Sequence, residues 1–217
     1  MTVLVTGAGG FVGRHVVREL VASGGQVRAM VRDVHGARML ENVDCELVRG
    51  DVTDAASLLA ATRGCRAVVH LAAILTGRPG DFERVMARGA RNLVEAAREA
   101  GVRRFVLMSA IGAAADTRGS VPYYRAKWAA EQAVQGSGIG HAILRPSFVF
   151  GADGGALPRF LRLVRLAPVT PVIGSGRQRI QPVWIDDVVR AVTLALRRED
   201  DLLVEIGGPD VVDWVTL

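Results

Sequence analysis

A tyrosine and a lysine lie four residues apart in the run YYRAK at 123–127. Lys127 is the only lysine of the chain, and the other 26 of its 27 basic residues are arginines. Residues at positions i and i+4 share one face of a helix, which places the Tyr123 phenol beside the Lys127 ammonium. The ammonium favours the phenolate, which helps the phenol to exchange protons near neutral pH. The pair is therefore a candidate for proton transfer, and the alternative is an incidental spacing on a solvated helix face.

A glycine-rich loop follows the first apolar run, in the sequence TGAGGFVG at 6–13. Gly7, Gly10 and Gly13 lie between a predicted strand and a predicted helix. Glycine permits the tight turn and lets backbone N–H groups approach a pyrophosphate at the positive end of the helix. This context predicts a dinucleotide site, and the alternative is a purely structural glycine turn.

The end of the second predicted strand bears on which dinucleotide binds. An acidic residue there holds a ribose 2′-hydroxyl, whereas an arginine accepts a 2′-phosphate. The sequence Val31-Arg32-Asp33 offers both, but Val31 falls where the acid of NAD-binding enzymes usually lies. Arg32 follows it directly, which favours NADP(H) and leaves NAD(H) as the alternative. Arg32 is otherwise a surface arginine in a chain that has many.

Strands and helices that alternate along the chain must position these groups. The apolar runs that predict strands are 3–5, 27–31, 45–48, 67–71, 105–108, 142–144 and 203–206. Helices are predicted after the glycine loop, after residue 54, at 82–100, after Pro122 and at 188–196. This order predicts an α/β fold, a Rossmann-type doubly wound parallel sheet. We expect an NAD(P)-binding Rossmann domain at 1–150 and a partial substrate-side lobe at 151–217, packed on the same domain.

Composition narrows the class of protein. The chain has 217 residues, half of them hydrophobic, and no apolar stretch approaches the ~18 residues of a membrane span. Its start lacks the pattern of a signal peptide, so we expect a cytoplasmic protein, or one peripheral at the inner membrane face. The net charge of +5 is spread along the chain, which suits anionic ligands but predicts no nucleic-acid surface. Cys45 and Cys65 have no CxxC or His partner, so neither a metal site nor a disulfide is predicted.

Several runs together resemble the extended and atypical short-chain dehydrogenase/reductase superfamily, and the resemblance covers nearly the whole chain. They are TGAGGFVG at 6–13, GDVTD at 50–54, HLAA at 70–73, RNLVEAAREAGVRRFVLMSA at 91–110, YYRAK at 123–127, LRPSFVFG at 144–151 and PVWIDDV at 182–188. Within this superfamily of epimerases, dehydratases and reductases, the chain is most similar to proteins like the nucleotide-binding accessory subunit of respiratory complex I. NmrA-like proteins come next.

The resemblance implies a set of cofactor and catalytic residues. Tyr123 would transfer the proton, and Lys127 would bind the nicotinamide ribose and lower the pKa of Tyr123. Backbone after Pro146 would meet the nicotinamide carboxamide. The implied contacts of the adenosine and phosphate parts are Gly7, Gly10, Phe11, Val12, Gly13, Arg32, Asp51, Val52, Leu71, Ala72 and Ala73.

The other half of the family's active site departs from the pattern. Ala110 stands where a Ser or Thr hydroxyl is usual, with Ser109 adjacent as the substitute donor to substrate, and Met86 stands where an Asn is usual. The relatives also continue past the equivalent of Gly207-Gly208, so the chain is expected to be either a truncated product or a short member. Cofactor binding is therefore better supported than turnover.

Two functions follow from this pattern. The first is an NADP(H)-dependent oxidoreductase or epimerase on a small carbonyl or hydroxyl substrate, with Tyr123, Lys127 and Ser109 as catalytic residues. The alternative is a non-catalytic dinucleotide-binding accessory subunit or redox sensor. The sequence assigns neither the substrate nor the oligomeric state.

Three further features have simpler interpretations. His70, at a strand end, is expected to be a hydrogen-bonded structural histidine. Asp186 and Asp187 are expected to cap a helix or stabilise the lobe rather than to catalyse. The arginines Arg159, Arg162 and Arg165 alternate with apolar residues, which predicts either a surface helix or a basic face toward a membrane or a complex partner.

Overall fold

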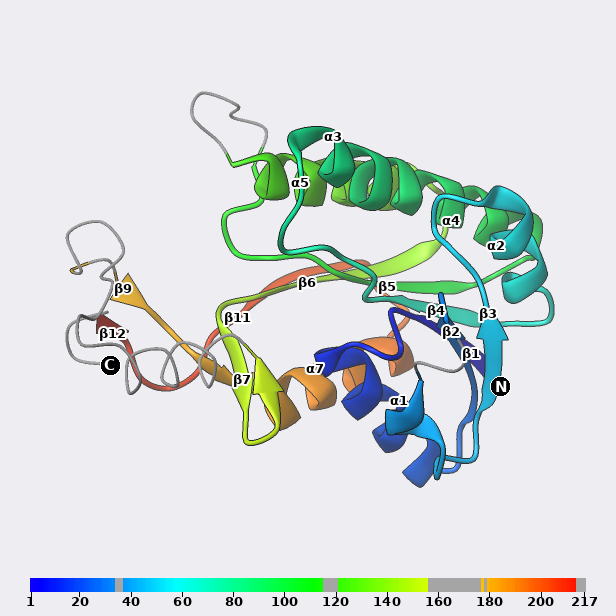
Figure 1. Cartoon of the computed structure of the whole chain (residues 1–217), viewed down its shortest axis with the longest axis horizontal. Coiled ribbons are helices and arrows are strands. Elements are labelled where there is room, and N and C mark those ends of the chain that lie inside the picture. The colour runs from blue at the N-terminus through cyan, green and yellow to red at the C-terminus, as the bar shows by residue number, and fades with distance from the viewer. Residues whose placement is uncertain (34–36, 115–120, 156–176, 178, 214–217) are drawn as a thin grey trace.

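A parallel seven-stranded sheet forms the middle layer of the protein, in a computed structural model that describes residues 1–33, 37–114, 121–155, 177 and 179–213 (Figure 1). Its order is β11-β6-β5-β4-β1-β2-β3. The strands are β1 (Thr2–Thr6), β2 (Gln26–Val31), β3 (Glu46–Arg49), β4 (Ala67–His70), β5 (Arg104–Met108), β6 (Gly140–Pro146) and β11 (Leu202–Ile206). All seven were predicted from apolar runs, and the Rossmann-type fold is confirmed.

Helices cover both faces of this sheet (Figure 1). On one face lie α1 (Phe11–Ala22) and α7 (Ile185–Arg197), which contact each other. On the other lie α2 (Ala55–Thr62), α4 (Gly89–Glu99) and α5 (Pro122–Gln135). Alternation along β1 divides the core accordingly, with Val3 and Val5 in one apolar cluster and Leu4 in the other. A sheet covered on both faces explains why its strands read as continuous apolar runs.

The helix predicted at 82–100 is divided into three parts. It begins as α3 (Pro79–Phe82), continues as a π-helical segment at Glu83–Arg88 and ends as α4. α4 begins at Gly89, where a Cβ would lie 2.8 Å from Cγ2 of Val52, so glycine allows the close approach of these two segments. π-helical turns are often found at functional sites, because they change which side chains face a cleft.

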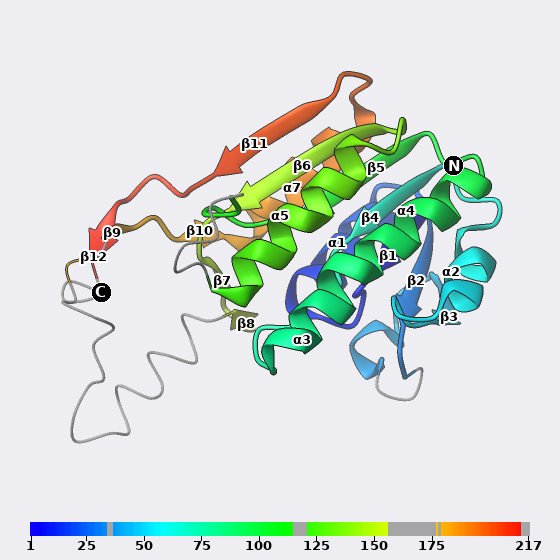
Figure 2. The ribbon, with the colours of Figure 1, turned by 90° about the horizontal axis from the view of Figure 1, so that it is seen from above.

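The remaining strands are short and lie beyond the carboxyl end of β6. β10 (Val183–Trp184), β7 (Val149–Gly151) and β8 (Gly154–Gly155) form one small sheet, and β12 (Val212–Asp213) pairs with β9 (Arg179–Ile180). A 3₁₀ turn spans Arg38–Leu40. Figure 2 shows β9 and β12 set apart from the main sheet, whereas β11 and α7 belong to its layers. The domain boundary at 150 stays a prediction.

The topology places a crevice above β1. This strand pairs with β2 on one side and with β4 on the other. The chain leaves β1 through α1 toward β2, and returns through α2 to β4 on the opposite side. Open α/β sheets bind ligands at such a switch point, beyond the carboxyl ends of the strands.

Candidate functional site

The glycine loop between β1 and α1 forms a backbone cradle. The N–H of Gly10 donates to the carbonyl of Gly7 at 3.0 Å, and Gly7 has a φ of 69°, which favours glycine. A Cβ at Gly7 would lie 2.8 Å from the backbone nitrogen of Ala72, and one at Gly13 would lie 2.1 Å from the Gly7 oxygen. The first turn of α1 has neither a side-chain cap nor an acidic residue, so its N–H groups suit an anion.

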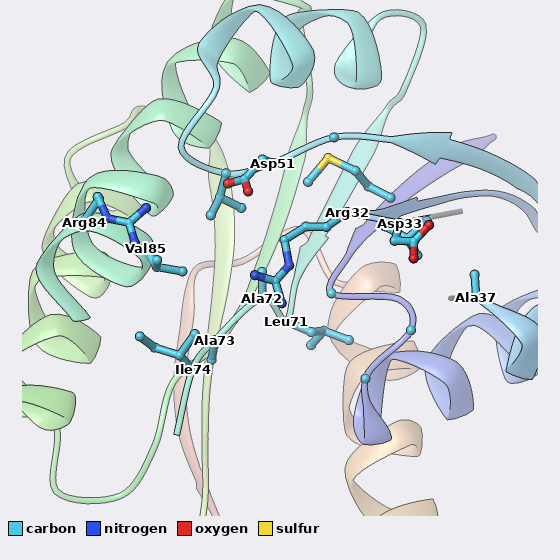
Figure 3. A pocket seen from close by; sticks show the side chains of 17 residues that line it. Arg32, Asp33, Ala37, Asp51, Leu71, Ala72, Ala73, Ile74, Arg84 and Val85 are labelled. Carbon is cyan, nitrogen blue, oxygen red and sulfur yellow. The ribbon is translucent and has the colours of Figure 1, made fainter. Parts of the chain in front are cut away.

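A cavity of about 640 Å³ opens from this loop along the crevice. Its walls come from the ends of β2, β3 and β4 and from the π-helical segment, and Figure 3 shows the side chains that line it. Eight predicted cofactor residues line it, namely Gly7, Gly10, Arg32, Asp51, Val52, Leu71, Ala72 and Ala73. A cavity of this volume is within the usual range of small-molecule and cofactor sites.

Two arginines line the cavity, together with the carboxylates of Asp33 and Asp51. Arg32 follows β2 and Arg84 lies on the π-helical segment, and their side chains extend toward one another beneath Asp51 (Figure 3). Arg84 also pairs with Asp81, with 3.1 Å between its Nη2 and Oδ1. Sequence reasoning missed Arg84, since a regular helix across 82–100 gives no sign of which side chains a π-helical turn directs into the crevice.

Asp51 is held as a carboxylate at the rim of this cavity. The backbone N–H and the hydroxyl of Thr53 both donate to its Oδ1 at 2.8 Å. The N–H bond lowers the pKa of Asp51 most, and the charges of Arg32 and Arg84 lower it further. An ionised carboxylate accepts hydrogen bonds, which is compatible with the adenine contact that the resemblance implies for Asp51.

Other predicted cofactor residues do not line the cavity. The Phe11 ring packs on the small sheet, where Cβ atoms at Gly151 and Gly154 would lie 3.2 Å and 2.5 Å from it. In the next turn of α1, Arg14 pairs with Asp153 at 3.1 Å. The Pro146 carbonyl accepts a hydrogen bond from Ile111 at 3.1 Å. The contacts predicted for Phe11, Val12 and Pro146 stay predictions.

Lys127 lies inside the protein at the carboxyl end of β5. It is 5% exposed, and its Nζ donates to the Met108 carbonyl at 2.6 Å. Burial lowers the pKa of Lys127 to about 8, and the nearby Glu131 charge partly opposes this effect. Its Nζ lies 5.7 Å from the centroid of the Tyr123 ring, so the helix brings the pair together as the spacing predicts.

The Tyr123 phenol titrates in the opposite direction from the expectation. Its ring packs edge-on against Phe82 and Tyr124, with centroids 6.4 Å and 5.3 Å away. Burial, followed by the charge of Tyr124, raises the pKa of Tyr123 to about 12. The expected lowering of this pKa is therefore not found, because desolvation of the phenolate sets the direction of the shift. Tyr123 is a protonated phenol at neutral pH.

Ser109 is engaged inside the protein through its hydroxyl. It is buried, and its hydroxyl donates to Oε1 of Glu131, a buried carboxylate on α5. Arg145 binds the same carboxylate through Nε at 2.9 Å and Nη2 at 2.6 Å. In this structure the Ser109 hydroxyl is engaged by the Glu131–Arg145 ion pair, and its predicted contact with a substrate stays a prediction. Met86, at the position of the usual Asn, is buried in an apolar cluster with Phe82.

The remaining candidates have structural surroundings. His70 is buried, with its Nδ1 2.7 Å from the Thr6 hydroxyl, and burial lowers its pKa to about 3. Asp186 lies in the first turn of α7 and accepts a hydrogen bond from the Trp184 indole at 3.0 Å. Residues 156–176, with the basic stretch containing Arg159, Arg162 and Arg165, lie outside the described residues. Within the described part of the chain, no helix is long and apolar enough to cross a membrane.

Comparisons with known proteins also indicate a dinucleotide-binding protein. The model of the NAD(P)H-binding family matches residues 7–158. Ceramide reductase of Caulobacter vibrioides is 31% identical over 206 residues, which are 94% of this chain and 64% of the relative. Subunit 9 of the NADH dehydrogenase 1 alpha subcomplex of Arabidopsis thaliana is 30% identical, over 95% of this chain and 54% of the relative. The chain thus spans about half to two thirds of the length of these relatives.

The fold is also similar to that of solved structures. MoeE5 in complex with UDP-glucuronic acid and NAD superimposes with a TM-score of 0.84 at 29% identity, over 100% of this chain and 79% of that one. Epimerase and dehydratase structures share the fold.

Proposed function

The chain belongs to the NAD(P)H-binding family, and we propose that it is an NADP(H)-dependent oxidoreductase or epimerase acting on a small carbonyl or hydroxyl compound. Family membership confirms the resemblance to extended short-chain dehydrogenases/reductases, with the complex I subunit among the relatives. The observation that carries the proposal is the glycine cradle, which opens into a cavity bounded by Arg32 and Arg84.

The residues of the cavity fit a phosphorylated dinucleotide. The loop leaves no room for a Cβ at Gly7 or Gly13, so backbone N–H groups are free to approach a pyrophosphate. Arg32 and Arg84 supply two cations at the adenosine end, which suits a 2′-phosphate. The alternative cofactor is NAD(H), for which Asp33 beside Arg32 offers a carboxylate to a ribose hydroxyl. When bound, the nicotinamide supplies or accepts a hydride.

Tyr123 and Lys127 supply the proton chemistry in this proposal. The raised pKa of Tyr123 keeps the phenol protonated at neutral pH, so it donates a proton to a carbonyl oxygen of the substrate. The buried Lys127 ammonium orients the cofactor ribose and stabilises negative charge on the phenol after proton transfer. This protonation state favours the direction of carbonyl reduction. The Caulobacter relative is likewise named a reductase.

A second candidate function is cofactor binding without turnover. It is favoured by the hydrogen bond from Ser109 to Glu131 and by the apolar Met86, because at these two positions the described residues offer no free hydroxyl or amide to a substrate carbonyl. The Arabidopsis relative is named a subunit of NADH dehydrogenase. In this function the bound dinucleotide stabilises the fold or a complex.

Parallel titrations of NADPH and NADH, followed by nicotinamide fluorescence, test the cofactor assignment. We expect tighter binding of NADPH, and loss of one charged contact in Arg32→Ala should weaken it about 10- to 100-fold while NADH binding stays unchanged. Arg49→Ala, on β3 and outside the cavity, is the matched control. Equal binding of both cofactors would contradict the assignment to NADP(H), and no binding would contradict the proposed function.

Turnover separates the two candidate functions. Oxidation of NADPH is followed at 340 nm with a panel of small aldehydes and ketones, for the wild type and for Tyr123→Phe. Loss of oxidation in Tyr123→Phe with unchanged NADPH affinity supports the oxidoreductase. Tight binding with no oxidation in either protein supports the binding subunit.

A further inference from the structure

A buried ionic cluster lies directly behind the Tyr123–Lys127 pair. Its centre is Glu131, which is 1% exposed and lies on α5 one turn beyond Lys127. Arg145 on β6 grips both carboxylate oxygens, and Ser109 after β5 donates to one of them. Arg145 also reaches Glu205 on β11 at 3.6 Å. The cluster therefore joins α5 to three strands of the sheet.

The cluster supplies the buried Glu131 carboxylate with three donors. A buried carboxylate is costly unless it is paired and its lone pairs are satisfied. Arg145 supplies a two-pronged ion pair, at 2.9 Å and 2.6 Å, and Ser109 supplies a third donor. Because these donors come from β6 and from the residue after β5, they also fix the direction of the Glu131 side chain relative to the sheet.

Lys127 has few groups around it that favour its charge. Within the described residues, its Nζ donates to the carbonyl of Met108, the residue before Ser109. From β4 it faces His70, which is neutral because burial, and then the charge of Lys127, lowers its pKa to about 3. From its own helix it faces the protonated Tyr123 and the Glu131 carboxylate. Glu131 belongs to the ion pair behind Lys127. Its charge raises the pKa of Lys127 and so opposes the lowering that burial causes.

We propose that Glu131 is a positioning residue that keeps Lys127 protonated and aligned at the cofactor site, and that Arg145 and Ser109 hold Glu131 in this role. The consequence of this inference for catalysis rests on the proposed function, because an uncharged Lys127 neither stabilises a phenolate at Tyr123 nor attracts an anionic cofactor. Its physical basis is independent of the cofactor, because a buried ammonium with a carboxylate one helical turn away keeps its proton more readily than one without such a charge nearby.

The single lysine of the chain makes the test direct. Protein labelled with ¹³C at the lysine ε-carbon gives one side-chain signal, that of Lys127, whose chemical shift follows its titration. We expect a midpoint of about 8 in the cofactor-free wild type. In Glu131→Gln the midpoint should fall by about one to three pH units, the usual effect of an opposite charge at close range. Glu131→Asp keeps the charge and should restore most of the shift.

Glu205→Gln is the matched control, because Glu205 also contacts Arg145 but is exposed. Its midpoint should equal that of the wild type. If Glu131→Gln does not fold, Glu131→Gln/Arg145→Gln removes the unpaired guanidinium and should still lower the midpoint. An unchanged midpoint in whichever of these proteins folds overturns the proposal.

The pH profile of NADPH affinity gives a second measurement. In the wild type we expect binding to weaken as the pH rises through the Lys127 midpoint, and in Glu131→Gln the weakening should begin at lower pH. A uniform loss of affinity at every pH would indicate a merely structural role for Glu131 and would also overturn the proposal. Failure of the wild type to bind NADPH would instead contradict the proposed function, while the lysine titration would still test the inference.

Discussion

Acid should destabilise this protein through His70. The side chain is enclosed between Thr6 and Phe105, and burial lowers its pKa from 6.5 to about 3. The unfolded chain therefore takes up a proton near pH 6.5 that the folded chain refuses. Between pH 6.5 and pH 3 the unfolded state binds more protons, so the free energy of unfolding falls as the pH falls.

The size of this effect follows from the two pKa values. With 6.5 in the unfolded chain and about 3 in the folded protein, the contribution of His70 at pH 5 is a loss of about 2 kcal/mol, and at pH 4 a loss of about 3 kcal/mol. Such a loss is a large part of the ~5–15 kcal/mol that stabilises a typical domain.

Urea unfolding of the wild type and His70→Asn at pH 7, 6, 5 and 4.5 measures the contribution of His70 to the free energy of unfolding. Carboxylates also contribute to acid unfolding, but they are common to both proteins, so the difference between the two curves isolates His70. We expect His70→Asn to be less stable at pH 7 and to lose less stability on acidification. Thr6→Val keeps the histidine buried and should retain the wild-type pH dependence. Parallel pH dependence in the wild type and His70→Asn would refute the reasoning.

Two further substitutions test the site and its scaffold. Gly13→Ala places a Cβ 2.1 Å from the Gly7 oxygen, so it should abolish NADPH binding in fluorescence titrations and lower stability by about 1–3 kcal/mol or more. Gly80→Ala, with no atom within 4 Å of its Cβ, is the control, and equal binding by both variants would contradict the cradle. Asp54 caps α2 by accepting two backbone N–H bonds, and Asp54→Ala should cost about 1 kcal/mol in urea unfolding. The exposed Asp44→Ala should cost little, and equal losses would contradict the capping role.

The strands and the glycine loop were predictable because their signals are local. Continuous apolar runs and glycines at fixed spacing depend only on neighbouring residues. The i, i+4 spacing likewise predicted that Tyr123 and Lys127 meet. These features fixed the fold and the phosphate end of the cavity.

Other parts of the site depend on contacts between distant segments. The raised pKa of Tyr123 comes from burial, which spacing along one helix does not reveal. The hydrogen bond from Ser109 to Glu131 was not predictable either, because Glu131 and Arg145 come from a helix and a strand that are distant in the sequence. Arg84 required the π-helical segment, whose irregular spacing follows from packing and not from a sequence pattern.

The packing of α1 on the small sheet has a consequence for the order of folding. The glycine loop and α1 come early in the sequence, yet Phe11 and Arg14 of α1 contact Gly154 and Asp153, which lie about 140 residues later. During synthesis, α1 therefore cannot form its contacts with the small sheet until residues 153 and 154 have been made.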